Sequence, residues 1–393
     1  MKKPMQLYIH IPFCVKKCAY CDFLSFAADE KTQNAYVQAL KKELDFYGNK
    51  YSDRYVSTIF IGGGTPSWLD ADAMAAIMEC VYSNFEVASD AEITIECNPG
   101  TVSDEKFAVY KSTGINRLSI GLQSANNEEL KTLGRIHTYE QFLSTYEKAR
   151  KHGLSNINVD LMSALPGQTT EGFLDSLKKV VRLKPEHISA YSLIIEEGTP
   201  FYERYQKDVE LREAGHQTIF LPGEEEEYRT TKQTQAFLQA EGYHWYEISN
   251  FAKPGRECRH NIGYWKRADY LGVGLGAASL IDNVRYSNTD DLDNYIKEMT
   301  QGDMRGCGAV ASEEAVSRDA QMEEFMFLGL RMVDGFHRDE FAQAFGVAIE
   351  GVYDAQLQRL KQEELLVQKE GCIRLTEKGI DISNYALSQF LLS

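Results

Sequence analysis

The sequence lacks an apolar run long enough to cross a lipid bilayer. A spanning helix needs roughly 18 or more consecutive apolar residues, and the 393 residues contain no such run. The segment from Met1 to Leu7 is too short for the apolar region of a secretory signal. We therefore expect a cytoplasmic protein with no integral membrane span.

Positive charge is also scarce. The chain has 42 Lys and Arg against 58 Asp and Glu, which gives a formal net charge of -16. Nucleic-acid phosphates are bound by clustered Lys and Arg, so the composition argues against a nucleic-acid partner. The acidic excess instead favours solubility.

The eight cysteines do not have the distribution of a disulfide framework. Three of them lie close together near the N-terminus, and five are scattered. This usage fits a reducing compartment. We expect the scattered ones to be buried as small apolar residues rather than to be ligands; they are Cys80, Cys97, Cys258, Cys307 and Cys372.

Strand-like and helix-like segments alternate through the first half of the chain. Apolar, strand-like runs lie at 7–11, 57–61, 92–97, 116–123, 156–162 and 187–195, with helical spacing at 30–46, 71–82, 104–112, 139–152 and 172–182 between them. Single helices between strands favour parallel βαβ units. The pattern changes after Pro200, so the sequence predicts an α/β fold, a partial (βα)6 TIM-like barrel rather than a complete eight-fold one.

The second half divides into two further segments. A helix with an acidic start is predicted at 223–242, followed by short β-like pieces at 244–248, 260–265 and 270–280. From about Ser312 the sequence turns helical, with a hairpin expected near 365–375 and a last helix from Thr376. This end resembles a small winged-helix-like module, for which the charge disfavours DNA binding. We expect three domains: the barrel at 1–222, a barrel-completing α/β segment at 223–310, and a smaller, mainly helical C-terminal domain at 311–393.

Three cysteines follow the first predicted strand directly. Cys14, Cys18 and Cys21 lie on the loop that begins at Pro12. Thiolates spaced this closely favour an iron-sulfur cluster, zinc or copper(I). A structural zinc normally has four protein ligands, so His10 would have to complete a zinc site. Three thiolates on a four-iron cluster would leave one iron open, and the ligand count favours this second interpretation.

The cysteine spacing, with the aromatic Tyr20 before the third cysteine, resembles that of the radical S-adenosylmethionine (SAM) superfamily. The longer segments Tyr8-Ile9-His10-Ile11-Pro12-Phe13-Cys14 and Cys18-Ala19-Tyr20-Cys21 resemble the oxygen-independent coproporphyrinogen III oxidase-like family, which also includes haem chaperones. The resemblance covers nearly the whole chain. It implies a radical SAM partial barrel, a 4Fe-4S cluster with SAM on its open iron, haem as a further ligand, and a place in porphyrin metabolism.

One departure from the dehydrogenases of this family concerns Phe23. Those enzymes have a fourth cysteine at this position, and they have a longer segment before the motif than the thirteen residues that precede Cys14 here. Both differences favour a haem chaperone that passes haem to an acceptor protein, expected to be respiratory. The alternatives are oxidative decarboxylation of coproporphyrinogen III by a 5′-deoxyadenosyl radical, or a radical SAM reaction on another substrate.

Polar residues stand at the ends of several predicted strands, where parallel α/β folds bind ligands. A glycine turn such as Gly62-Gly63-Gly64 can expose N–H groups to a carboxylate, although most glycine turns are only turns. Arg135 could hold a carboxylate through two hydrogen bonds. The resemblance implies SAM contacts for a larger set: Tyr8, Tyr20, Gly63, Gly64, Thr65, Glu96, Gln123, Arg135 and Asp160.

A second motif lies at Cys258 to Trp265. Imidazole is a common haem ligand, and Tyr and Trp offer flat apolar surface to a macrocycle. On chemistry alone, a histidine beside two aromatics is more often a packed strand residue. The segment resembles a haem-chaperone motif, which implies haem contact for His260, Asn261, Tyr264 and Trp265.

Overall fold

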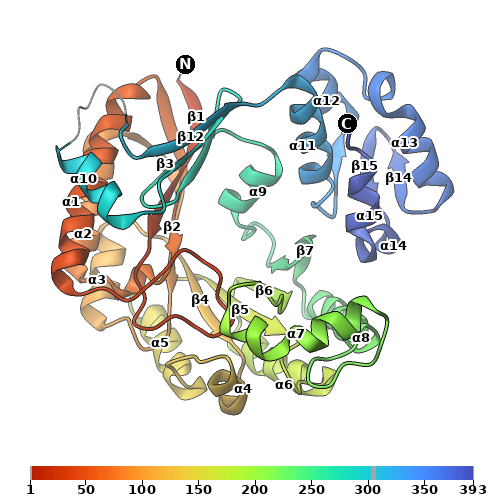
Figure 1. Cartoon of the computed structure of the whole chain (residues 1–393), viewed down its shortest axis with the longest axis horizontal. Coiled ribbons are helices and arrows are strands. Elements are labelled where there is room, and N and C mark those ends of the chain that lie inside the picture. The colour runs from red at the N-terminus through yellow and green to blue at the C-terminus, as the bar shows by residue number, and fades with distance from the viewer. Residues whose placement is uncertain (1, 302–306, 393) are drawn as a thin grey trace.

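The computed structural model describes residues 2–301 and 307–392. Its centre is a twelve-stranded sheet in the order β12-β11-β10-β9-β1-β2-β3-β4-β5-β6-β8-β7 (Figure 1). The six neighbours β1 to β6 are all parallel, which confirms the predicted partial (βα)6 barrel. Their bounds are β1 Lys3–Ile11, β2 Arg54–Gly63, β3 Glu86–Cys97, β4 Arg117–Gln123, β5 Asn156–Ser163 and β6 His187–Ser192.

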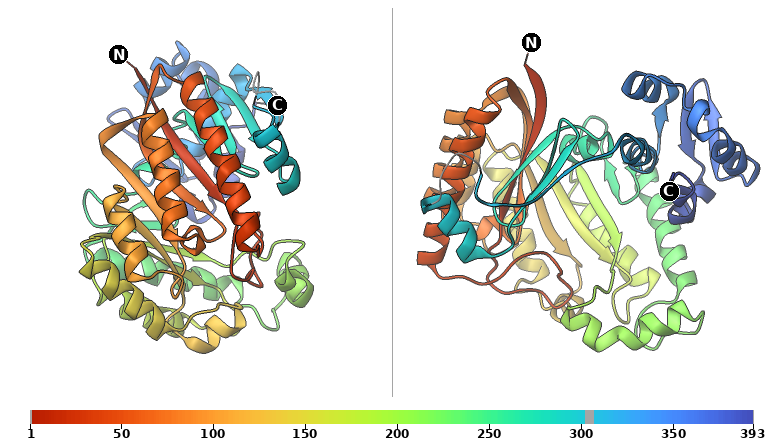
Figure 2. Two further views of the ribbon diagram at one scale, coloured as in Figure 1. Left: turned by 90° about the vertical axis from the view of Figure 1, so that its left-hand side faces the viewer. Right: turned by 45° about the horizontal axis from the view of Figure 1, so that its top comes forward.

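The connecting helices cover the outer face of this sheet (Figures 1 and 2). The predicted ones are α1 Glu30–Lys50, α2 Ala71–Asn84, α3 Asp104–Ser112, α5 Tyr139–Lys151, α6 Thr170–Val181 and α8 Glu224–Ala240. The sequence did not predict the 3-10 helix η1 Pro66–Trp68 or the helices α4 Asn127–Thr132, α7 Pro200–Glu213 and α10 Leu292–Gln301. Local caps explain several starts; for example, the Asp29 side chain accepts from the Thr32 amide at the beginning of α1.

Short strands extend the parallel core at both edges. β9 Tyr270–Val273 is parallel to β1, and antiparallel strands follow beyond it: β10 Ala278–Ile281, β11 Val284–Asn288 and β12 Val310–Ala315. β8 Asn250–Ala252 and β7 His244–Glu247 are antiparallel beyond β6. The prediction that the chain turns helical from Ser312 is therefore wrong, because residues 310–315 pair with β11. The predicted boundary between 310 and 311 falls inside β12, and the three-domain division stays a prediction.

The strands alternate between an apolar outer face and a polar inner face. Leu7, Ile9 and Ile11 of β1 are fully buried in the main core, whereas Tyr8 and His10 between them bond to each other. Carboxylates, an arginine and hydroxyl groups occupy inner positions of β3, β4 and β5 in the same way. This polar lining places titratable groups inside the barrel.

Residues 260–265 form a helix, not the predicted strand. This helix, α9 Arg259–Trp265, packs on β2. The Glu92 carboxylate of β3 accepts from the amides of Arg259 (3.2 Å) and His260 (3.1 Å) and so caps the N-terminus of α9. Because Glu92 is distant from α9 in sequence, the local pattern did not predict this helix.

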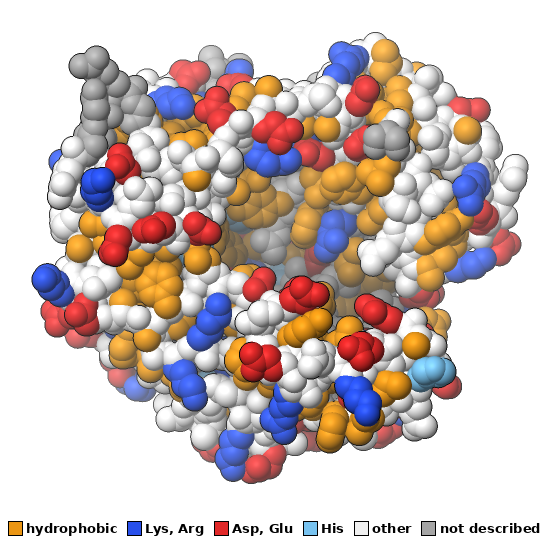
Figure 3. Space-filling model, in the orientation of Figure 1, with side chains coloured by type: hydrophobic (Ala, Val, Ile, Leu, Met, Phe, Trp, Pro, Cys, Tyr) orange, Lys and Arg blue, Asp and Glu red, His pale blue; other side chains and the backbone are white. Residues whose placement is uncertain are grey.

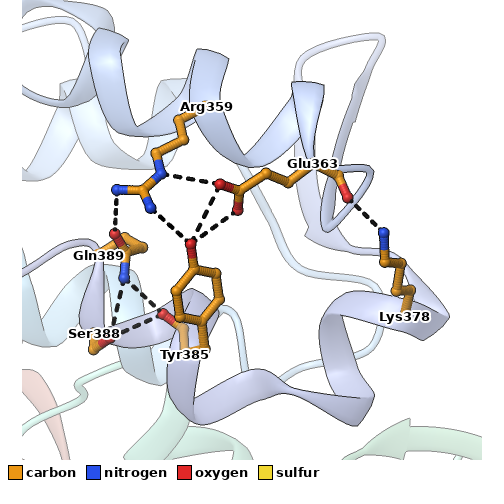
Figure 4. Close-up of polar contacts among 6 residues, drawn as sticks. All are labelled: Arg359, Glu363, Lys378, Tyr385, Ser388 and Gln389. Atoms are coloured by element: carbon orange, nitrogen blue, oxygen red, sulfur yellow. Dashed lines mark hydrogen bonds and ion pairs between the residues drawn. The ribbon is translucent and has the colours of Figure 1, made fainter.

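The C-terminal part has its own hydrophobic core. Its elements are α11 Arg318–Gly329, β13 Phe336–His337, α12 Arg338–Phe345, α13 Glu350–Gln362, β14 Leu366–Lys369, β15 Cys372–Leu375, α14 Glu377–Asp381 and α15 Ser383–Ser388. The three strands form one sheet, β13-β15-β14, in agreement with the predicted hairpin and helices. A polar cluster around Arg359, Glu363 and Tyr385 joins α13 to α15 (Figure 4).

This C-terminal part contacts both ends of the large sheet. Glu324 of α11 pairs with Arg267 (2.7 Å) and with Arg285 of β11 (2.9 Å). Beyond α11, the Val333 amide donates to the Tyr246 carbonyl of β7 at 3.0 Å. Figure 3 shows a hollow in this face of the molecule, between the barrel and the C-terminal part.

The described residues include no helix that is both long and apolar enough to span a membrane.

One buried carboxylate, Glu43, joins α1 to the added strands. It accepts from the Gly274 amide (2.7 Å), Asn288 Nδ2 (2.6 Å) and the Tyr295 hydroxyl (2.6 Å). Burial, opposed by these three hydrogen bonds, raises the pKa of Glu43 to about 7. The side chain is therefore a structural hub for three segments.

We expect Glu43→Ala to destabilise the protein by about 3 kcal/mol or more, because it leaves three buried donors without an acceptor. The midpoint of thermal unfolding, followed by circular dichroism, measures this loss. Lys42→Ala, one position earlier and exposed, is the matched control and should be neutral. An unfolding midpoint of Glu43→Ala equal to that of the control would contradict the assigned role.

Candidate functional site

A cavity of about 300 Å³ lies at the C-terminal ends of the parallel strands, at the lower end of the range for small-molecule sites. It is lined by most of the residues for which the sequence predicted a cluster or SAM. These are Cys14, Cys18, Cys21, Tyr20, Gly63, Gly64, Thr65, Glu96, Gln123, Arg135 and Asp160. Segments more than 140 residues apart in sequence thus meet at one place, as the parallel topology requires.

Main-chain hydrogen bonds fix the cysteine loop over the strand ends. The Cys14 amide donates to the Phe26 carbonyl (3.0 Å), and the Phe26 amide donates to the Pro12 carbonyl (2.9 Å). On the far side, the Ala19 amide donates to the Leu133 carbonyl (3.1 Å). The loop is therefore closed on itself and attached to the turn that precedes Arg135.

Glycine is required at 63 and 64 for close approach. Gly63 has φ +110°, and a Cβ on it would lie 2.5 Å from the His10 ring. A Cβ on Gly64 would lie 2.9 Å from the Phe13 carbonyl oxygen. The amides of this turn bond to protein acceptors: Gly63 to Glu96 (3.1 Å), Gly64 to Ile11 (2.8 Å) and Thr65 to Phe13 (2.8 Å). The expectation that these N–H groups face a ligand is therefore wrong, and the glycines instead let the cysteine loop sit against β2.

Two buried carboxylates face the cavity. Burial, together with the nearby charge of Asp160, raises the pKa of Glu96 to about 8. Burial also raises the pKa of Asp160, against hydrogen bonds from Asn158, Ser189 and Ser119. The charge of the buried Arg117 opposes this rise for both carboxyls, and Lys16 and Lys17 also line the cavity, so the site offers charges of both signs to a ligand.

The remaining cavity residues bond to one another and to the cysteines. The Thr65 hydroxyl lies 3.3 Å from Cys14 Sγ. Arg135 donates from Nη1 to Cys18 Sγ (3.6 Å), while its buried Nε has no partner among the described residues. Gln123 accepts from the Tyr191 hydroxyl (2.9 Å), and Tyr20 packs on Phe201. Three thiols beside a partnerless arginine nitrogen and two carboxylates fit a cluster with an amino-acid ligand.

Tyr8 and His10 lie below the cavity floor rather than in its lining. His10 has both ring nitrogens engaged, Nδ1 with the Tyr8 hydroxyl (3.0 Å) and Nε2 with the Leu24 carbonyl (3.0 Å). The zinc alternative needs a free His10 nitrogen. Within residues 2–301 and 307–392, no three His, Cys, Asp or Glu side chains are grouped as ligands of one metal ion.

The second predicted motif lies on α9, on the inner face of β2. His260 is buried, with Nδ1 2.8 Å from the Thr58 hydroxyl and Nε2 3.0 Å from the Tyr264 hydroxyl. Burial and the charge of Arg117 lower the pKa of His260 to about 3, so the imidazole is neutral. Asn261, Tyr264 and Trp265 are partly exposed. Arg331 of the C-terminal part lies 4.4 Å above the Trp265 ring.

Several cavity residues were missed. Asn98, Ser119, Gly121 and Tyr191 line it, as does Cys97, which is buried as expected. The predicted strand ends at 97, 123 and 195 placed each of these residues near the same edge. What the sequence did not indicate is which of them support another side chain rather than face the cavity.

We expect Glu96→Gln to change how stability depends on pH in the cluster-free protein. The folded pKa of about 8 lies above the ordinary 4.5, so the folded state keeps a proton that the unfolded state loses. The stabilising effect of this proton is fully present below pH 4.5 and is lost as pH rises through 8. Glutamine can still accept from Gly63 and does not titrate.

Urea unfolding at pH 5 and pH 9 measures the effect. The stability of Glu96→Gln relative to the native chain should rise by roughly 2 to 4 kcal/mol between these pH values. Glu105→Gln, an exposed position on α3, is the control. Parallel pH profiles for Glu96→Gln and the native chain would show that Glu96 is not a buried, protonated carboxyl.

Comparison with known proteins agrees with this geometry. Residues 8–180 match the Radical SAM superfamily, and residues 316–382 match the HemN C-terminal domain. The heme chaperone HemW of Lactococcus lactis subsp. lactis (strain IL1403) is 35% identical over 392 residues, which cover 100% of this chain and 98% of that protein. The heme chaperone HemW of Escherichia coli (strain K12) is 37% identical over 389 residues, covering 99% and 98% respectively.

Among solved structures, the coproporphyrinogen III oxidase HemN of Escherichia coli, described as a radical SAM enzyme, superposes with a TM-score of 0.84. The match has 25% sequence identity and covers 100% of this chain and 91% of that one. The fold and the resemblance predicted from the cysteine motif are thereby confirmed. With full-length identity above 30% to several of its members, the chain belongs to the HemW family of radical SAM proteins.

Proposed function

We propose that this protein is a haem chaperone that binds a 4Fe-4S cluster, SAM and haem, and passes haem to an acceptor protein. The observation that supports it best is the meeting of Cys14, Cys18 and Cys21 with two carboxylates and Arg135 in one cavity. The family membership points the same way, since the curated relatives are named heme chaperones. The acceptor is proposed to be respiratory, and the site of action the cytoplasm.

In this proposal the chain's own residues hold both groups. Cys14, Cys18 and Cys21 would hold the cluster through their thiolates and would leave one iron without a protein ligand, where SAM could bind. Glu96 and Asp160 would balance the positive charge of SAM, and Arg135 would reach its carboxylate through Nε. Tyr20, Gly63, Gly64, Thr65 and Gln123 would shape the remaining wall, with Tyr8 behind it. When bound, a cluster with SAM supplies one-electron cleavage chemistry.

The haem contacts are proposed at α9. Asn261, Tyr264 and Trp265 offer partly exposed polar and aromatic surface on this helix. The neutral imidazole of His260 is in the protonation state that ligates iron. To do so it must give up its bond to Thr58 or to Tyr264. Haem binding at this residue therefore requires the Thr58 or the Tyr264 hydroxyl to leave the imidazole.

A second candidate function is the oxidative decarboxylation of coproporphyrinogen III. The full-length likeness to the HemN structure favours it. Against it stands Phe23, whose side chain lines the cavity and is 67% exposed, where the dehydrogenases resembled have a cysteine. The two functions differ in a single measurable outcome, the conversion of the porphyrinogen.

We expect the anaerobically reconstituted protein to contain about four irons per chain and to bind haem without converting coproporphyrinogen III. Iron, sulfide and zinc analysis measures the cluster content, and haem titration followed by absorbance measures haem binding. Incubation with coproporphyrinogen III, SAM and a strong reductant tests for conversion of the porphyrinogen. Stoichiometric zinc without iron would exclude the cluster, and formation of protoporphyrinogen IX would establish the dehydrogenase instead.

For His260→Ala we expect haem affinity to fall by about tenfold or more, or about 1.4 kcal/mol, with a changed absorption spectrum. Thr58→Val is the matched variant, because it removes one hydrogen bond of the imidazole but keeps the ring. It should bind haem at least as well as the native chain, since Nδ1 is released. A native spectrum and affinity in His260→Ala would exclude this histidine from the haem site.

A further inference from the structure

Arg135 makes an unusual set of contacts for a ligand-binding arginine. Its Nη2 donates to the Gly121 carbonyl (2.6 Å) and to Asn98 Oδ1 (3.1 Å), while Nη1 donates to Cys18 Sγ (3.6 Å). Two of the three guanidinium nitrogens are therefore engaged with protein, and one of these bonds ends on a cysteine sulfur. A bound amino acid would find only Nε without a partner among the described residues.

The position of this guanidinium is fixed both by a side-chain partner, Asn98, and by the backbone that precedes Arg135. Asn98, directly after β3, also lies 3.1 Å from His137 Nδ1, and His137 Nε2 lies 3.3 Å from the Leu122 carbonyl. The backbone before Arg135 is attached to the cysteine loop through the Ala19 amide and the Leu133 carbonyl. Arg135 and Cys18 therefore keep their relative position through main-chain contacts as well as through the side chain.

The three cysteine sulfurs differ in their donors. Cys14 faces the neutral Thr65 hydroxyl, and Cys21 faces the neutral backbone amide of Phe23. Among the described residues, Cys18 is the one of the three whose sulfur accepts a hydrogen bond from a charged group, since a guanidinium is always protonated. The Lys17 ammonium acts on Cys21 through its charge, without such a bond. A positive charge in a buried site acts strongly on a neighbouring centre that changes charge. Hydrogen bonds and charge near the sulfurs are among the factors that set cluster potentials.

We propose that Arg135 raises the reduction potential of the cluster through its contact with Cys18, and that Asn98 is the positioning residue that aims it. The inference rests on the proposed cluster at Cys14, Cys18 and Cys21. When the cluster accepts one electron from an external donor, its negative charge increases by one. The fixed guanidinium stabilises this reduced form over the oxidised one, and Asn98 holds Nη2 so that Nη1 points to the sulfur.

The test is an EPR-monitored redox titration of anaerobically reconstituted protein, with dithionite as the electron donor and without SAM. Leaving SAM out separates this role from any contact of Arg135 with that ligand. We expect Arg135→Gln to shift the ratio of reduced to oxidised cluster at a fixed potential at least tenfold toward oxidised, which is about 59 mV for a one-electron couple. Asn98→Ala should shift it in the same direction by less.

Two further variants separate charge from structure. Arg135→Lys keeps the charge but cannot bond to Gly121, Asn98 and Cys18 together, so its potential should fall between those of the native chain and Arg135→Gln. Arg374→Gln removes an exposed arginine on β15, in the C-terminal part, and should leave the potential unchanged. If Arg135→Gln does not retain the cluster, the midpoint potentials of Asn98→Ala and Arg135→Lys test the role of Arg135 in its place.

The experiment distinguishes a failure of the role proposed for Arg135 from a failure of the proposed cluster. Native iron content in the variants with an unchanged midpoint potential would overturn the role of Arg135 and leave the proposed function intact. A native chain that binds no iron-sulfur cluster on reconstitution would overturn both. A shift in Arg135→Gln equal to that in Arg374→Gln would show that only net charge matters, which also overturns the proposed contact.

Discussion

The site depends on the main-chain hydrogen bonds between the cysteine loop and the end of β2. Gly64 and Thr65 donate to the carbonyls of Ile11 and Phe13, which extends the pairing of β1 and β2 past the last strand residues. The approach is so close that a Cβ on Gly64 would collide with this backbone. The same contact brings the Thr65 hydroxyl to Cys14. Together with the bond from the Ala19 amide to the Leu133 carbonyl, it fixes the three cysteines relative to the carboxylates of β3 and β5.

A second constraint is the polar inner face of the sheet. Glu92, Glu96 and Asp160 are buried carboxylates on neighbouring strands, an arrangement that opposes folding unless each has a partner. The fold supplies one to Glu92, in the N-terminus of α9. Glu96 and Asp160 also accept from neutral groups, and the charge of the buried Arg117 acts on both. Glu92 thus supports the fold, whereas Glu96 and Asp160 line the cavity that also holds the cysteines.

The sequence predicted those features that depend on local pattern. The six parallel strands, their covering helices and the position of the cysteines at a strand end follow from apolar periodicity and turn residues. The C-terminal hairpin was predicted in the same way. Glu96 and Arg135 were expected in one site because of the family resemblance, and the shared edge of the parallel strands agrees with that expectation.

Long-range partners account for most of what was missed. Residues 260–265 are helical because Glu92, about 170 positions earlier in the chain, caps them, and residues 310–315 are a strand because β11 lies beside them. The glycine turn was predicted to face a ligand, but its amides face the cysteine loop. The hydrogen bond from Arg135 to Asn98 was likewise not predicted, since no local sequence pattern indicates that an asparagine at a strand end will bind a distant arginine.

The contacts of the C-terminal part have a consequence for the barrel itself. The sheet does not close on itself; its two margins are joined through Glu324 at one side and Val333 at the other. The circumference of the barrel is thus set by a separate folded unit and not by strand pairing. A shift of that unit would change the interior at the cost of the contacts at these two margins, among them the bridge between Glu247 and Met332 and the contact of Arg331 with Trp265, while the pairing of β1 to β6 would stay intact.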